Sequence, residues 1–185
     1  MHLTLILGPM FAGKSTAILT KVRRARSLGW NTLVLTSALD TRYQDAVSEV
    51  KTHDQDHVKA LGVSSLLTVK AESEYAEARL VIIEEAQFFK DLYEFVLEAV
   101  EVDGKDVVVV GLDGDSDRRP FGDVLRLIPL ADEVVKLTAL CKRCGDGTAA
   151  LFSALVVGQK TEQICVGGAD RYEPLCRRHF LENKS

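Results

Sequence analysis

The most recognisable chemical pattern lies near the start of the chain. Residues 8–15 read GPMFAGKS and fit the G-x-x-x-x-G-K-[ST] pattern of a phosphate-binding loop at every fixed position. Glycines let such a loop turn its backbone N–H groups toward phosphate oxygens, and a helix beginning near Lys14 adds its positive end. The Lys14 ammonium supplies a charge for the outer phosphates, and the Ser15 hydroxyl can ligate Mg²⁺. The predicted ATP-binding residues here are Gly8, Pro9, Met10, Phe11, Ala12, Gly13, Lys14, Ser15 and Thr16.

Two adjacent acids follow a short apolar run later in the chain. Glu84 and Glu85 come directly after the run at residues 80–83. One carboxylate can order Mg²⁺ through water, and its neighbour can accept the proton of an attacking hydroxyl. Neighbours in a strand point to opposite faces, so both can serve only if the chain turns there. Two solvated acids opening a helix are the alternative, but the phosphate-binding pattern favours catalysis.

Two short motifs near the C-terminal end carry metal-ligand spacing. Cys141 and Cys144 form a C-x-x-C, and Cys176 and His179 form a C-x-x-H. Three thiolates and one imidazole make a complete tetrahedral set for a structural Zn²⁺. A redox C-x-x-C is the alternative, but it leaves Cys176 and His179 unexplained. The remaining Cys165 lies in neither motif and is expected to be an ordinary packed side chain.

The elements that must position these residues follow from hydrophobic periodicity. Short apolar runs predict buried strands at residues 2–7, 32–36, 80–83 and 107–112. Helical spacing predicts one helix through Ile18, Val22 and Ala25 that ends at Gly29, and a second one through Phe88, Leu92, Phe95, Val96 and Ala99. A further short helix is expected at 123–130 and a loop at 39–58. Alternating strands and helices predict an α/β fold, a P-loop NTPase-like parallel sheet flanked by helices, with a small C-terminal zinc-binding subdomain.

Composition sets limits on location and partners. The net charge is −4 with no basic run, which argues against direct nucleic-acid binding. No apolar stretch approaches the ~20 residues that cross a bilayer, and Leu3–Leu7 is too short for a secretory signal. We therefore expect a cytoplasmic protein without membrane contact. The composition changes near residue 132, which predicts a P-loop domain at 1–132 and a zinc-knuckle subdomain at 133–185.

With these motifs in place, the chain resembles the zinc-containing, P-loop thymidine kinase family nearly end to end. The segments that carry the resemblance are GPMFAGKST at 8–16, DTRY at 40–43, THD at 52–54, EEAQFF at 84–89, GLDGDSDRRPFG at 111–122, PLADEVVKLTALCKRC at 129–144 and GGADRYEPLC at 167–176. The resemblance implies transfer of phosphate from ATP, with Mg²⁺, to the 5′-hydroxyl of thymidine or another pyrimidine deoxynucleoside. It also implies self-association, commonly as a homotetramer, and inhibition by the end-product triphosphate.

The resemblance also assigns roles to residues. Glu85 falls at the catalytic base, Glu84 at the Mg²⁺-water position, and Asp40 with Arg42 at a polar pair near the phosphates. The implied nucleoside-binding residues are Met10, Glu85, Gln87, Phe88, Leu112, Ser116, Phe121, Ser153, Gln163, Ile164, Cys165, Val166, Gly167 and Tyr172. Backbone groups of 163–167 would read the pyrimidine edge while aromatic rings cover its faces. The zinc subdomain would anchor this loop, which closes over the base.

The chain departs from the family pattern mainly around the base. Glu84 replaces an Asp, Ser116 an aromatic residue, Ser153 a Thr, Leu155 an Arg, and His179 the fourth Cys. These changes predict weaker discrimination among pyrimidine nucleosides. Two other functions fit parts of the pattern. One is a zinc-containing P-loop ATPase acting on nucleic acid, and the other is a nucleotide-binding module whose activity has decayed.

Overall fold

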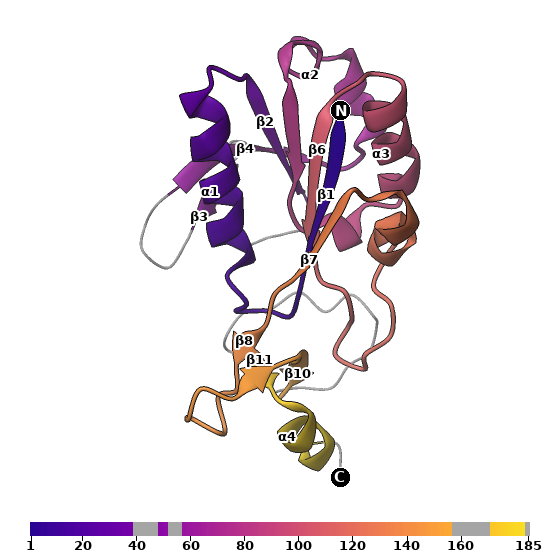
Figure 1. The fold of residues 1–185 in the computed structure, drawn as a ribbon. Coiled ribbons are helices and arrows are strands. Elements are labelled where there is room, and N and C mark those ends of the chain that lie inside the picture. Colours follow the sequence, from indigo (N-terminus) through magenta and orange to yellow (C-terminus); the bar gives the residue numbers. More distant parts are fainter. Residues whose placement is uncertain (39–47, 52–56, 157–170, 184–185) are drawn as a thin grey trace.

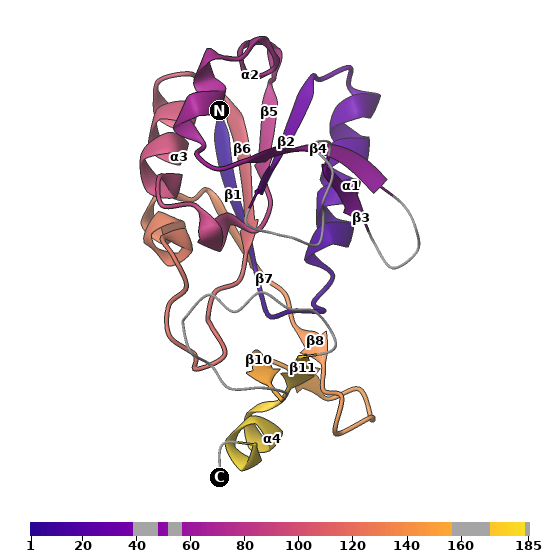
Figure 2. The same cartoon turned by 180° about the vertical axis from the view of Figure 1, so that it is seen from behind.

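The computed structural model describes residues 1–38, 48–51, 57–156 and 171–183. These residues form a helix-flanked sheet and a smaller part, which lies beyond the end of the sheet opposite the N-terminus (Figures 1 and 2).

The sheet has seven strands in the order β3-β4-β2-β5-β6-β1-β7. Their bounds are β1 His2–Leu7, β2 Thr32–Ser37, β3 Ser48–Lys51, β4 His57–Val63, β5 Leu80–Ile83, β6 Asp106–Gly111 and β7 Glu133–Lys136. All neighbours pair in parallel except β3 with β4 at one edge. The carboxyl ends of β1, β5 and β6 therefore meet at one edge of the sheet, where ligands bind in open α/β folds.

Helices cover both faces of this sheet (Figures 1 and 2). α1 spans Lys14–Ser27, α2 Ser73–Glu77 and α3 Leu92–Glu101, and 3₁₀ turns occupy η1 Leu67–Ala71, η2 Ala86–Phe88 and η3 Val124–Leu130. Side chains alternate along each strand. In β1, Leu5 packs into the core beneath α3, whereas Ile6 packs into the core beneath α1. Because both faces are buried, the central strands read as continuous apolar runs.

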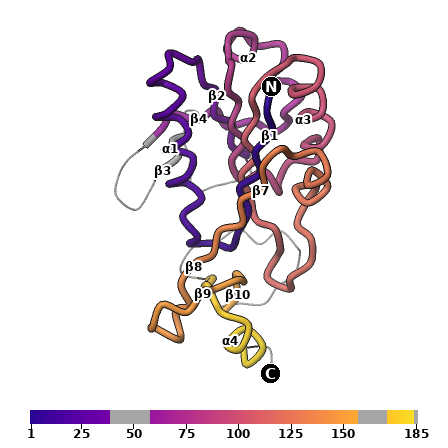
Figure 3. Tube along the Cα trace, viewed as in Figure 1, coloured from indigo at the N-terminus to yellow at the C-terminus, as the bar shows by residue number. Residues whose placement is uncertain are grey.

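The smaller part contains two short antiparallel pairs and a helix, and the C-terminus lies beside it (Figure 3). β8 Ala139–Leu140 pairs with β9 Ala149–Ala150, β10 Phe152–Leu155 pairs with β11 Tyr172–Leu175, and α4 spans Arg177–Glu182. It has its own buried cluster, formed by Ala139, Cys141, Ala150, Ala154, Leu175, Cys176 and Phe180.

The four predicted strands and the first helix are confirmed, while other expectations need correction. The loop expected at 39–58 is wrong where β3 and the start of β4 form, because an antiparallel edge strand needs little apolar sequence. Phe88 lies in η2 and not in α3, and the helix expected at 123–130 is a 3₁₀ turn that contains Pro129.

The last strand of the main sheet lies later in the sequence than the change of composition near residue 132 predicted. β7 follows the expected domain boundary at residue 132, yet it pairs in parallel with β1. The main sheet therefore continues to Lys136, and the division into two domains stays a prediction. Among the helices of the described ranges, none is both long and apolar enough to cross a membrane.

Candidate functional site

The predicted phosphate-binding loop connects the end of β1 to the start of α1. Its backbone turns through left-handed conformations at Phe11 (φ 66°) and Gly13 (φ 80°). A Cβ atom at Gly8 would lie 2.6 Å from the carbonyl oxygen of Leu137, so only glycine fits between the two segments. No side chain caps the first turn of α1 by hydrogen bonding. The N-terminal N–H groups of α1 are therefore suited to an anion.

Lys14 and Ser15 sit at the start of α1, and the side chains of both make hydrogen bonds at this end of the sheet. The Lys14 ammonium donates to the carbonyl oxygens of Gly8 at 3.1 Å and of Pro9 at 2.8 Å. The Ser15 hydroxyl donates to the Glu84 carboxylate at 3.1 Å, and Glu84 is buried. A hydroxyl beside a carboxylate, next to a phosphate-binding loop, is a donor set that suits Mg²⁺.

The turn expected at the carboxylate pair is present. Glu84 continues the strand direction, with its N–H donating to Leu35 at 2.8 Å, whereas Glu85 has left-handed backbone angles (φ 50°, ψ 41°). Non-glycine residues rarely adopt this conformation, and such outliers cluster at active sites. This turn is the feature that the sequence required if both carboxylates are to serve one site.

Gln87 connects Glu85 to the neighbouring strand end. The N–H of Leu112 donates to Gln87 Oε1 at 3.0 Å, and Gln87 Nε2 donates to Glu85 Oε2 at 2.5 Å. Because the Leu112 N–H needs an acceptor, the amide must present its NH₂ group to the carboxylate. Gln87 is buried, so its amide fixes the position of the Glu85 side chain.

The segment after β6 carries several residues of the predicted nucleoside pocket. The rings of Phe88 and Phe121 meet edge to face, with centroids 5.6 Å apart. Ser116 is buried within a tight loop organised by Asp115, whose Oδ1 accepts the N–H groups of Asp117 at 2.8 Å and Arg119 at 2.9 Å. Sequence reasoning missed Asp115, although an Asp that bonds the backbone two residues later is a known turn signal.

Other predicted pocket residues come from the C-terminal part. The hydroxyl of Ser153, in β10, accepts the N–H of Met10 at 2.9 Å, and Tyr172 lies opposite Leu155 in the β10–β11 pair. The remaining predicted residues, Asp40, Arg42, Gln163, Ile164, Cys165, Val166 and Gly167, lie outside the described residues.

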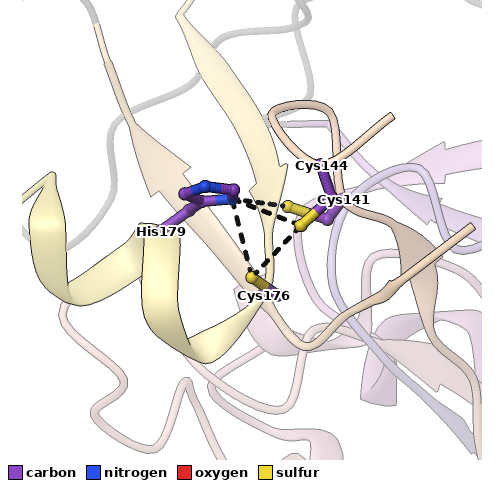
Figure 4. Close-up of side chains that lie close together, drawn as sticks. All are labelled: Cys141, Cys144, Cys176 and His179. Carbon is purple, nitrogen blue, oxygen red and sulfur yellow. Dashed lines mark hydrogen bonds between the residues drawn. The ribbon is translucent and has the colours of Figure 1, made fainter. Parts of the chain in front are cut away.

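The four predicted metal ligands converge in the C-terminal part (Figure 4). Cys141, Cys144, Cys176 and His179 place their ligand atoms within 4.8 Å of one another. The His179 Nδ1 atom lies 3.4 Å from two of the sulfurs and 3.7 Å from the third, and Cys144 Sγ lies 3.8 Å from Cys176 Sγ. A tetrahedral Zn²⁺ with bonds of about 2.3 Å to sulfur and about 2.0 Å to nitrogen separates two sulfurs by about 3.8 Å, and sulfur from nitrogen by about 3.5 Å. The cluster therefore has the dimensions of a zinc site.

Hydrogen bonds around the cluster favour thiolate at one ligand. Burial alone would raise the pKa of the Cys141 thiol, but hydrogen bonds from the Cys176 backbone and the His179 side chain lower that pKa to about 6. Glu173, in β11, forms ion pairs with Lys142 at 2.9 Å and Arg143 at 3.6 Å. These pairs connect the segment between Cys141 and Cys144 to β11. Four protein ligands would complete the coordination of such an ion, which is typical of a structural metal.

Comparison with known proteins adds the family. A family model described as thymidine kinase matches residues 1–180. The chain belongs to the thymidine kinase family. The kinase from Arabidopsis thaliana named thymidine kinase a is 42% identical over 181 residues, which cover 96% of this chain and 74% of that protein.

Two other relatives extend the comparison to animals and viruses. The cytosolic human thymidine kinase is 42% identical over 184 residues, covering 100% of this chain and 75% of the human protein. The thymidine kinase of vaccinia virus (strain Western Reserve) is 37% identical over 182 residues, covering 98% of both chains. Membership of the thymidine kinase family makes this chain a phosphotransferase, and these matches do not favour the alternative of an ATPase acting on nucleic acid.

Proposed function

We propose that the protein transfers the γ-phosphoryl group of ATP to the 5′-hydroxyl of thymidine. The supporting observation is that the phosphate-binding loop, Glu84 and Glu85 meet at one edge of the sheet, with Ser15 hydrogen-bonded to Glu84. In the reaction a bond forms between the 5′-oxygen and the γ-phosphorus, the bond from that phosphorus to the β–γ bridging oxygen breaks, and ADP leaves.

Each residue would have a distinct task in this reaction. Glu85 accepts the proton of the 5′-hydroxyl, and the amide of Gln87 holds its carboxylate in place. Lys14 and the first N–H groups of α1 bind the phosphates. Ser15 and Glu84 would hold Mg²⁺, which would supply positive charge to neutralise the phosphates.

The base would lie among the residues that follow the strand ends and those of the C-terminal part. Phe88 and Phe121 offer apolar surface to a pyrimidine ring. Ser116 stands where the family pattern has an aromatic side chain that would stack on the base. Asp40 and Arg42 near the phosphates, and the 163–167 backbone at the base edge, complete this proposal. The zinc ion would be structural and would hold the two knuckles together.

Glu85→Gln tests the proposed base. This variant keeps the size of the side chain but cannot accept the proton, so kcat should fall about 10²–10⁴-fold while ATP affinity stays within about twofold of wild type. Thymidine monophosphate is measured with labelled ATP and zinc-replete protein. Glu94→Gln, an exposed change on α3, is the matched control and should keep full activity. Normal turnover by Glu85→Gln would refute the assignment, and no nucleoside product from wild type would refute the function.

We also propose a cytosolic location, like that named for the human relative, and self-association as a homotetramer or dimer. Sedimentation equilibrium of the zinc-replete protein measures the assembly. A monomer at micromolar concentration would contradict this part of the proposal.

A further inference from the structure

The phosphate-binding loop contacts the C-terminal part of the chain at two points, and its first residue packs on the segment that leads into that part. At its first residue, Gly8 packs against the Leu137 backbone, whose N–H also donates to Leu7 at 2.8 Å. In its middle, Met10 donates its N–H to Ser153 at 2.9 Å across 143 residues of sequence. Further along, Ala12 packs on the buried cluster of the C-terminal part.

That buried cluster contains metal ligands. Cys141 and Cys176 both belong to it, and both are buried. The side chain of Ala12 therefore rests on the same small core that the metal would hold together. The phosphate-binding loop, which connects β1 to α1 in the main part of the protein, therefore packs on the same hydrophobic cluster as the predicted metal ligands.

Ser153 is the polar link between these two sites. It is 5% exposed and pairs with Pro174 in the β10–β11 ladder, two residues before Cys176. The N–H of Leu151, two residues before Ser153, donates to the Leu175 carbonyl oxygen at 3.1 Å. A two-stranded sheet is marginally stable by itself in water, so the position of Ser153 depends on the groups that hold β11. These are the Lys142 N–H, which donates to the Pro174 carbonyl oxygen at 3.1 Å, the Glu173 ion pairs, and the predicted metal ligand Cys176, which follows the strand.

We propose that Ser153 is a positioning residue that holds the phosphate-binding loop through Met10 and thereby couples ATP affinity to zinc occupancy. With zinc bound, β11 is fixed, β10 stays paired and the hydroxyl meets the Met10 N–H. Without zinc, the hairpin loosens, the N–H loses its acceptor and the loop samples conformations that bind phosphate poorly. This inference rests on the proposed function only in taking ATP as the ligand of the loop.

Ser153→Ala and Ser153→Thr separate this role from a contact with the base. ATP affinity is measured by calorimetry on zinc-replete protein with Mg²⁺ and without nucleoside. Ser153→Ala should bind ATP about 5- to 10-fold more weakly, because an N–H loses its partner, and the amide of Met10 should exchange faster with solvent. Ser153→Thr keeps the hydroxyl and should retain wild-type affinity. Thr138→Ala, which removes an exposed hydroxyl of the same part, is the matched control.

Zinc removal supplies the second arm of a thermodynamic cycle. Chelation should weaken ATP binding in wild type. The loss of ATP affinity that chelation causes should be smaller in Ser153→Ala, because this variant already lacks the hydrogen bond between residue 153 and Met10. Equal losses in both proteins would overturn the coupling. If chelation unfolds the chain, the zinc-replete comparison decides alone.

The outcomes distinguish this inference from the proposed function. Normal ATP affinity and a protected Met10 amide in Ser153→Ala would overturn the inference, even if thymidine is phosphorylated. A changed KM for thymidine with unchanged ATP affinity would also overturn it, since Ser153 would then act on the base. A wild type that binds ATP with the predicted Ser153 dependence but makes no thymidine monophosphate would support the inference and refute the function.

Discussion

Gly122 is a position where one added methyl group should disturb the proposed active site. It follows Phe121 with a φ of +59°, and a Cβ there would lie 2.4 Å from the carbonyl oxygen of Gln87. Real Cβ contacts essentially never fall below 3.0 Å, so the two backbones must separate by at least about 0.6 Å. The side chain of Gln87 holds Glu85, so Gly122→Ala moves the proposed base as well as destabilising the fold.

The chain offers a matched control for the backbone strain alone. Gly104 has a similar φ of +67°, but a Cβ there would meet nothing within 4 Å. Gly104→Ala should cost about 1 kcal/mol in unfolding free energy from the left-handed conformation. Gly122→Ala adds a collision with packed backbone, which brings the total to about 2–4 kcal/mol.

Urea unfolding and steady-state kinetics test both consequences. Gly104→Ala should keep wild-type kcat, while Gly122→Ala should lower kcat about 10-fold or more, because misplacing a catalytic group by a fraction of an ångström is costly. Equal unfolding free energies and equal kcat values for the two variants would refute the reasoning, since strain alone would then explain both.

Three further predictions follow from other contacts. The Tyr75 hydroxyl donates to the Asp103 carboxylate at 2.6 Å and lowers the pKa of that carboxyl. The ionised carboxylate therefore stabilises the folded protein fully when the pH is above the pKa of Asp103 in the unfolded chain. This stabilisation is lost as the pH falls through the lower pKa of Asp103 in the folded protein. Asp103→Asn should therefore reduce the unfolding free energy by about 1 kcal/mol at pH 7 and weaken the acid dependence of urea midpoints below about pH 4, and an unchanged acid dependence would contradict this. Cys144→Ala should lower bound zinc well below one per chain and reduce the melting temperature, whereas Cys165→Ala should retain zinc, as metal analysis would show. The values of kcat/KM for thymidine, deoxyuridine and deoxycytidine should lie within about 10-fold of one another, because Ser116 would give the proposed nucleoside pocket one stacking contact fewer than an aromatic side chain. A strong preference for thymidine would contradict this prediction.

The sequence predicted the parts of this protein that local patterns encode. β1, β5 and β6 are buried on both faces, so their apolar runs stand out. The convergence of the three Cys and His179 was predictable because the type and spacing of metal ligands specify such a cluster almost completely, and the structure confirms that Cys141 and His179 come together. The phosphate-binding loop is confirmed as a turn between strand and helix for the same reason.

Other features depend on contacts that no local pattern records. The edge strand β3 has alternating and charged residues that resemble a loop. The link between Met10 and Ser153 spans 143 residues, and its acceptor was predicted only as a neighbour of the base. α4 was missed because one buried residue, Phe180, leaves no helical period to detect.

The bonds that Lys14 makes to Gly8 and Pro9 change how its mutants should be interpreted. The ammonium donates hydrogen bonds to two carbonyl oxygens of its own loop. It has three N–H donors to divide between these carbonyl groups and a nucleotide. Replacing this lysine therefore removes two hydrogen bonds within the loop together with a contact to the nucleotide. A loss of ATP affinity in such a mutant therefore combines a change in loop conformation with the loss of a positive charge, and the measured loss is the sum of the two effects.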